Sequence, residues 1–165
     1  MKKQCMVILV ENNSGVLARV SSLFMQRGFN IDSLTVSSTE DPKISRITVM
    51  ATGDQKTFSQ ILKQTTKLIE TKMIFSVEPS FSLIRELLLV KFSTENSDPT
   101  QLKKIIDDFG ASVIDITSGC FVAELSASSQ KIDDFLQATK DFEMVELCRS
   151  GAIAMERGQV AYDLN

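Results

Sequence analysis

The expected secondary-structure elements occur in the same order in two successive halves of the chain, and this repeat constrains the fold more than any other feature. Strands are indicated by short apolar or alternating runs, and helices by apolar residues that recur every three or four positions. The first half reads strand, helix, strand, strand, helix, strand, in residues 6–10, 16–27, 34–37, 47–51, 58–62 and 73–77. The second half repeats this order in residues 87–90, 98–109, 113–116, 121–125, 132–136 and 145–147. The two halves therefore share one architecture, offset by roughly 80 residues.

This order is typical of the split βαβ, or ferredoxin-like, unit, in which two helices cover one face of a four-stranded antiparallel sheet. We therefore predict an α+β protein with two tandem ferredoxin-like domains, at residues 1–78 and 83–158. Residues 151–165 show no clear periodicity, and we expect 159–165 to form a partly ordered tail.

The composition excludes several classes of function. Histidine is absent, which excludes Ser-His-Asp triads, imidazole acid–base catalysis and most zinc sites. Neither a nucleotide-binding glycine loop nor an acid–base pair at a recognisable spacing is present, so no catalytic residue, metal or cofactor is predicted on this chain.

Charge and hydropathy limit the expected partners and location. The net charge is −3 and the basic residues are scattered, which argues against nucleic acid or an anionic membrane surface as a partner. No apolar run approaches the ~18 residues of a membrane helix, and the N-terminus passes directly into a strand pattern. We therefore expect a cytoplasmic protein.

The loop before the first helix has the features of an anion-binding site. Gly15 lies in this loop, between the strand at 6–10 and the helix that starts near Val16, and the carboxamides of Asn12 and Asn13 lie nearby. The backbone N–H groups of residues 14–17 have no acceptor within the helix, and they lie at the positive end of its dipole. The corresponding loop of the second half contains no glycine, an acidic Asp98 and a proline. We therefore expect a carboxylate-sized anion site in the first half only.

Structural roles remain open for several of these residues. Taken alone, Gly15 and Asn30 are residue types expected in turns, and Asn12 is equally consistent with a ligand-binding role or a turn. Arg46 and Arg149 lie in strand segments, where charged side chains are usually solvated. The three cysteines, Cys5, Cys120 and Cys148, lie in strand-like segments without CxxC spacing and are expected to be buried free thiols.

Several segments resemble a known family. The first half contains ENNSGVLARVSSLFMQRGFNIDSLTV at 11–36, DPKISRITV at 41–49 and GD at 53–54. The second half contains IRELLLVKF at 84–92, FGASVIDIT at 109–117, KIDDFL at 131–136 and RSGAIAMERG at 149–158. The first set resembles the ACT domain, and the second set the C-terminal domain, of the small regulatory subunit of acetolactate synthase, also called acetohydroxyacid synthase. The resemblance covers nearly the whole chain.

The resemblance implies a chain without chemistry of its own. The large catalytic subunit of that enzyme is a separate polypeptide that uses thiamine diphosphate, Mg²⁺ and FAD, and the small subunit activates it and confers feedback inhibition by valine or other branched-chain amino acids. ACT domains of the family form a homodimer side by side and bind the effector at the interface. Carried onto this sequence, the family's binding residues are Asn12, Gly15, Val16 and Leu17 of one chain, with Asn30 and Ile31 of its neighbour.

Rival functions belong to other classes. An RNA-binding module of the same topology would stack bases on aromatic residues of its central strands, but residues 44–52 contain none. A small enzyme that uses lysine or carboxylates is not excluded by composition. The remaining alternative is a stand-alone ACT-type amino-acid-binding regulator of another enzyme or of transcription, although no helix-turn-helix segment is evident.

Overall fold

The computed structural model describes residues 2–26, 28–95 and 98–158, which form two compact units. Of these residues, the first unit comprises those up to Leu83 together with residues 152–158, and the second comprises those from Ile84 to Gly151.

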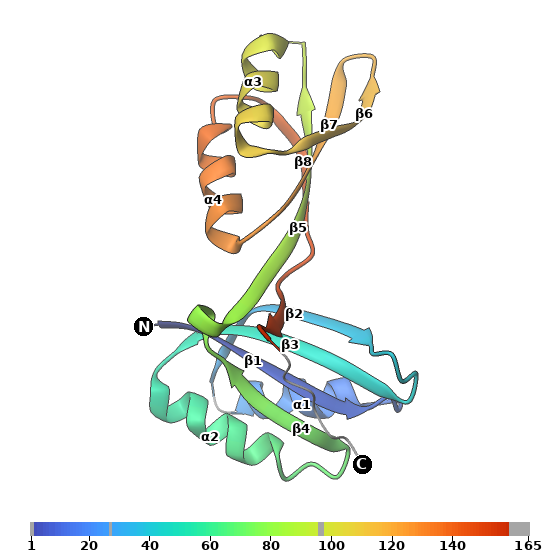
Figure 1. Ribbon diagram of the computed structural model, residues 1–165, viewed down its shortest axis with the longest axis vertical. Helices are drawn as coiled ribbons and strands as arrows, with labels where there is room; N and C mark the ends of the chain where they lie inside the picture. Colours follow the sequence, from blue (N-terminus) through green and yellow to red (C-terminus); the bar gives the residue numbers. More distant parts are fainter. Residues whose placement is uncertain (1, 27, 96–97, 159–165) are drawn as a thin grey trace. The chain divides into compact units, whose positions relative to one another are not determined.

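The first unit is the predicted ferredoxin-like domain. Its elements are β1 (Lys2–Glu11), α1 (Val16–Gln26), β2 (Asn30–Ser38), β3 (Ile44–Gly53), α2 (Gln55–Thr65) and β4 (Thr71–Val77). The four strands pair antiparallel in the order β2-β3-β1-β4, and α1 and α2 lie on one face of this sheet (Figure 1). Gly28 follows α1 with a left-handed φ of 62°, as its place after the last apolar residue predicts.

The hydrophobic core of the first unit lies between the sheet and its two helices. Alternate residues of β1 face the helices, and they pack against apolar residues of α1, α2 and β3. Met6, Ile8, Phe24 and Phe58 are among the fully buried members. Each such side chain contributes about 1.5–3 kcal/mol relative to an exposed one.

The opposite face of this sheet is also apolar along β1, where Cys5, Val7 and Leu9 are buried. The strand β9 (Ile153–Glu156) lies on this face, away from the helices (Figure 1). Arg46 on β3 donates from Nη2 to the carbonyl oxygen of Ala154, at 2.6 Å. The predicted second domain extends to residue 158. In the structure, however, residues 152–158 belong to the first unit. Tertiary packing of this segment, which shows no periodicity, accounts for the difference.

The second unit repeats the architecture. A short 3₁₀ turn, η1 (Pro79–Phe81), leads into β5 (Ser82–Ser93), and α3 (Pro99–Phe109), β6 (Ser112–Thr117), β7 (Cys120–Ala127), α4 (Ser129–Ala138) and β8 (Met144–Arg149) follow. The strand order is β6-β7-β5-β8. The first residues of β5, Ser82 and Leu83, belong to the first unit, and β5 also pairs with β9. Its core lies between the sheet and the helices α3 and α4, and includes Leu88, Phe92, Leu102, Ile106 and Phe135.

Local signals in the sequence explain the ends of α3. The carboxylate of Asp98 accepts the N–H of Thr100 at 2.9 Å, and Pro99 occupies the first turn. Gly110 closes the helix with a left-handed φ of 68°. These contacts confirm the predicted start and end of this helix.

Three expectations about individual side chains are wrong. Arg46 and Arg149 are not simply solvated, because Arg46 bonds Ala154 and Arg149 bonds the carboxylates of Glu86 and Asp133. Of the cysteines only Cys5 is buried, while Cys120 is half-buried and Cys148 exposed. Strand periodicity does not reveal the two arginine contacts, because Ala154 is 108 residues from Arg46 and Glu86 is 63 residues from Arg149.

No helix in the described part of the chain is long and apolar enough to cross a membrane. Residues 159–165, for which a tail is predicted, lie outside the described residues.

Candidate functional site

The loop between β1 and α1 adopts the conformation that the anion-site hypothesis requires. Gly15 has a φ of 84°, a left-handed value that side chains other than glycine rarely adopt. Helix α1 starts at the next residue, so its first N–H groups have no acceptor in a preceding helical turn. The N–H of Val16 makes only a long bond of 3.4 Å to the carbonyl oxygen of Asn13. The positive end of the α1 dipole is therefore available to an anion.

Asn12 is fixed by the loop between β2 and β3. Its backbone N–H donates to the carbonyl oxygen of Lys43 at 2.7 Å, and its side-chain Nδ2 donates to that of Pro42 at 2.9 Å. The amide group of Asn12 is thus engaged, which differs from the expectation that it donates to an effector carboxylate. The other predicted role is that its Oδ1 accepts a hydrogen bond from an ammonium group, and the bond made by Nδ2 does not conflict with that role.

Four charged side chains surround this loop. The Nη2 of Arg19 lies 2.5 Å from a carboxylate oxygen of Glu70, and the Nζ of Lys72 lies 2.9 Å from one of Glu11. The backbone joins the two pairs, because the N–H of Glu11 donates to the carbonyl oxygen of Glu70 at 2.9 Å. Exposed ion pairs of this kind contribute only ~0–1 kcal/mol. They can therefore exchange partners with a charged ligand at little cost in stability.

An open hollow of about 490 Å³ adjoins Asn12, within the range of roughly 300–1,000 Å³ usual for ligand pockets. It lies between the end of β1, the β2–β3 loop and the start of β4, and its lining residues are Glu11, Asn12, Asn13, Asp41, Pro42, Lys43, Ile44 and Lys72. Both signs of charge line it, as recognition of a zwitterion requires. Of the predicted site residues only Asn12 lines it, while Gly15, Val16 and Leu17 lie along the adjoining loop and helix start.

Asn30 and Ile31 lie at the other end of the sheet. They pair with Thr52 and Ala51 near the end of β3, whereas Glu11, next to Asn12, pairs with Ile44 at its beginning. Thr52 lies eight positions after Ile44 along β3, a distance of roughly 25 Å at the usual strand rise. One chain therefore does not bring the two predicted groups together, and a site that uses both needs two chains. β2, which carries Asn30 and Ile31, is an edge strand.

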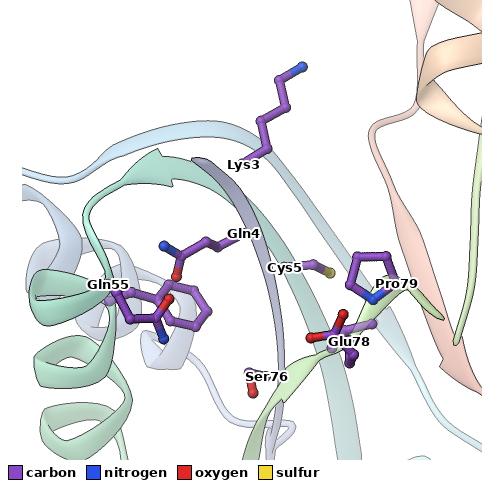
Figure 2. A pocket seen from close by; sticks show the side chains of 9 residues that line it. Lys3, Gln4, Cys5, Gln55, Ser76, Glu78 and Pro79 are labelled. Carbon is purple, nitrogen blue, oxygen red and sulfur yellow. The ribbon is translucent and has the colours of Figure 1, made fainter. Parts of the chain in front are cut away.

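A second hollow, at the opposite end of the first sheet, is a weaker candidate. It measures about 100 Å³ and is lined by Lys3, Gln4, Cys5, Gln55, Phe58, Ser76, Val77, Glu78 and Pro79. Figure 2 shows Gln4 and Gln55 on one side, Cys5 near Pro79 and Glu78 on the other, and Lys3 pointing away. Burial raises the pKa of the Cys5 thiol to about 11, an effect that the charge of Arg46 partly offsets. The thiol is therefore protonated at neutral pH and a poor nucleophile.

The described residues contain no group of three or more acidic or cysteine side chains placed to hold a metal ion. The sequence pattern also did not reveal the four charged residues Glu11, Arg19, Glu70 and Lys72 as part of the site. Glu11 and Arg19 lie within the segment that resembles the ACT domain, but Glu70 and Lys72 carry no local signal. Only the pairing of β4 with β1 brings these two residues to the loop.

Comparison with known proteins extends over both units. A family model described as the acetohydroxyacid synthase small subunit-like ACT domain matches residues 6–72, and one described as the small subunit of acetolactate synthase matches residues 85–158. The chain is 37% identical over 157 residues to the acetolactate synthase small subunit of Buchnera aphidicola from Schizaphis graminum, covering 94% of this chain and 99% of the relative. It is likewise 37% identical to the isozyme 3 small subunit of Escherichia coli K12, covering 94% and 96%.

A solved structure agrees with these relatives. The crystal structure of the acetolactate synthase small subunit from Thermotoga maritima superposes with a TM-score of 0.87 at 31% identity, covering 97% of this chain and all of that one. Identity above 30% over nearly the full length of the relatives, together with two family models that divide the chain between them, leads to one conclusion. The chain belongs to the acetolactate synthase small-subunit family.

Proposed function

We propose that this chain is the non-catalytic regulatory subunit of acetolactate synthase, which activates a separate catalytic subunit and makes it sensitive to valine or a related branched-chain amino acid. One observation carries the proposal. The left-handed Gly15 exposes the N–H groups at the start of α1 directly beside paired charges of both signs. An amino-acid zwitterion needs both kinds of group within a few ångströms of each other.

The carboxylate of the effector binds at the N–H groups of Val16 and Leu17. The guanidinium of Arg19 supports it, because Nη1 of Arg19 lies 3.7 Å from the position that a Cβ on Gly15 would occupy. The ammonium group binds at Oδ1 of Asn12 and near the carboxylates of Glu11 and Glu70. Charge-assisted hydrogen bonds of these kinds are roughly twice as strong as neutral ones.

The effector side chain requires an apolar wall. Leu17 is 42% exposed although it is apolar and lies in the first turn of α1, and it supplies one side of the wall. Ile31, together with Asn30, comes from the partner subunit across a homodimer in which edge strands β2 lie side by side. One methylene changes binding by only ~1–3 kcal/mol in such a pocket, so the site distinguishes branched aliphatic side chains from polar ones more strongly than from one another.

The catalytic subunit supplies the chemistry in this proposal. Thiamine diphosphate, Mg²⁺ and FAD are held on that subunit, in the cytoplasm, and the present chain contributes the effector site. Effector binding shifts the paired subunits between two states. A coupling free energy of about 1–3 kcal/mol is enough to change activity several-fold or more.

Calorimetric titration of the full chain tests this proposal, with valine, isoleucine, leucine and serine as ligands. We expect the wild type to bind valine with a Kd on the order of micromolar to millimolar, and serine more weakly. Gly15→Asp places a carboxylate where the effector carboxylate binds, and we expect at least ~10-fold weaker binding, a loss of ~1.4 kcal/mol.

Gly110→Asp is the matched control. Gly110 also has a left-handed φ, of 68°, and no atom lies within 4 Å of an added Cβ. The control therefore has a similar backbone cost, of ~1–2 kcal/mol, but lies in the second unit. Binding that is lost equally in both variants, or absent from the wild type for every amino acid, would contradict the proposal.

A further inference from the structure

The segment of residues 152–157, which we name the return segment, comes back from the second unit to the first. Gly151, buried and with a φ of 80°, precedes it. Three hydrogen bonds fix it within the first unit. The N–H of Ala152 donates to Oγ of Ser33 at 3.4 Å, Nη2 of Arg46 donates to the carbonyl oxygen of Ala154 at 2.6 Å, and the N–H of Arg157 donates to the carbonyl oxygen of Phe81 at 2.8 Å.

Burial alternates along the return segment as it does in a strand. Ala152 and Ala154 are 0% and 4% exposed, whereas Ile153 and Met155 are 56% and 66% exposed. The small residues thus face the sheet, and the large ones face outward. A larger side chain at residue 154 would push the segment away from the sheet, because close-packed interiors have little free volume.

Ser33, the residue on β2 that contacts this segment, lies next to the predicted effector contacts. Ile31 is two residues before it and Asn30 three, and the register of β2 against β3 shifts between Ile31 and Ser33. Such a register shift interrupts the regular ladder, and it redirects the side chains beside it as a bulge does. Any movement of β2 at Asn30 and Ile31 therefore also moves the hydroxyl that accepts the bond from Ala152.

Arg46 forms the second anchor, on the neighbouring strand. Arg46 lies opposite Ser37 of β2 in the sheet register. Its guanidinium carbon lies 5.9 Å from the centre of the Phe75 ring on β4. The side chain is half-buried, permanently charged and bonded to a backbone oxygen that a side-chain substitution cannot remove. It therefore holds the return segment against β3 while the Ser33 contact responds to β2.

We infer that the return segment is the connection through which an effector bound at Asn30 and Ile31 acts on the second half of the chain. This inference rests on the proposed function. Ser150 and Gly151 join the segment to the end of β8, so a displacement from Ser33 passes along the backbone into the second sheet. The acceptor at Ser33 and the small residues at 152 and 154 determine the regulatory response, and they do not determine effector affinity.

Two measurements on the same samples test the inference. The variants are Ser33→Ala, which removes the acceptor, and Ala154→Leu, which displaces the segment. The control is Ser37→Ala, on the same strand and exposed. We expect all three chains to bind valine within about 3-fold of the wild type by calorimetry. In the holoenzyme reconstituted with the catalytic subunit, we expect the first two to need roughly 2- to 30-fold more valine for half-inhibition.

Hydrogen exchange of the wild type provides a test that requires no variant. We expect valine to change the protection of residues 152–157 in the full chain. Unchanged protection there, or an unaltered valine response of both test variants, would overturn the inference while leaving the effector site intact. A wild type that binds no valine would instead overturn the proposed function, and the inference with it.

Discussion

The two halves of the molecule share one order of elements but differ at the loop between the first strand and the first helix. In the second half the start of the helix is capped by its own residues, because the carboxylate of Asp98 accepts the N–H of Thr100 and Pro99 lacks an N–H. In the first half Gly15 adopts a left-handed conformation and leaves the helix start open. The same topology thus leaves an open helix start, at which we propose the ligand site, in one copy and a self-satisfied helix start in the other, and loop chemistry decides between them.

The ion pairs of the two halves differ in the same way. In the second unit Arg149 bonds Glu86, whose side chain is 6% exposed, and also Asp133. In the first unit the Arg19–Glu70 pair is 49% and 19% exposed. The pair in the second unit holds α4 against two strands, whereas the pair in the first unit is free to exchange with a charged ligand.

The largest expected effect tests whether each half has a core of its own. Phe24 and Phe135 are both 0% exposed, one in each core. We expect Phe24→Ala or Phe135→Ala to lower the free energy of unfolding of its own unit by about 3–5 kcal/mol. Hydrogen exchange resolved along the chain measures this. Equal loss of protection in both units after either substitution would show that the halves share a single cooperative core.

A smaller effect tests the core of the first unit at alkaline pH. Cys5 has a pKa of about 11 in the folded chain against 9.0 for a free thiol. The unfolded chain therefore loses this proton first, so the contribution is complete below pH 9 and disappears as the pH rises through 11. We expect the first unit to lose about 2–3 kcal/mol over this range.

Urea unfolding at several pH values, followed in parallel for Cys5→Ala, measures the effect of Cys5. The difference between the two chains isolates this thiol from the titration of lysines and tyrosine. An identical pH dependence of the two chains would contradict this prediction.

The smallest expected effect compares the ion pairs. Arg149→Leu leaves the carboxylate of Glu86 buried with Ser129 as its remaining partner, and we expect a loss of about 2 kcal/mol. Arg19→Leu should cost less than ~1 kcal/mol, because both charges of that pair are reached by water. Denaturant unfolding measures both values. A larger loss for Arg19→Leu would mean that the Arg19–Glu70 pair is a structural contact rather than an exchangeable one.

Much of the fold could be predicted from the sequence, because its elements follow local rules. The apolar periodicity predicts the strands and helices, Asp98 and Pro99 predict the start of α3, and the glycines after α1 and α3 predict their ends. The return segment was not predicted, because residues 152–155 alternate in size but are all apolar, so they show no alternation of polar and apolar residues. The partner of Arg149 was likewise not predictable, since Glu86 is 63 residues away and only strand pairing brings them together.

For the candidate site, sequence reasoning identified the loop but not the charges around it. Gly15 and the start of α1 follow from a local pattern, whereas Glu70 and Lys72 reach the loop through the pairing of β4 with β1. The separation of Asn12 from Asn30 is a property of the sheet topology. This separation means that the proposed site needs two chains.

Complementation between two defective chains tests this central claim most directly. Chains with Gly15→Asp and chains with Asn30→Ala are co-expressed with different tags, and the mixed dimers are isolated and titrated with valine. Each proposed site combines the loop of one chain with Asn30 of the other, so one of the two sites in a mixed dimer is fully wild type. We expect weak or no binding by either homodimer and wild-type affinity, at half the wild-type stoichiometry, in the mixed dimer. Mixed dimers that bind no better than the homodimers would show that the site does not combine these residues from two chains.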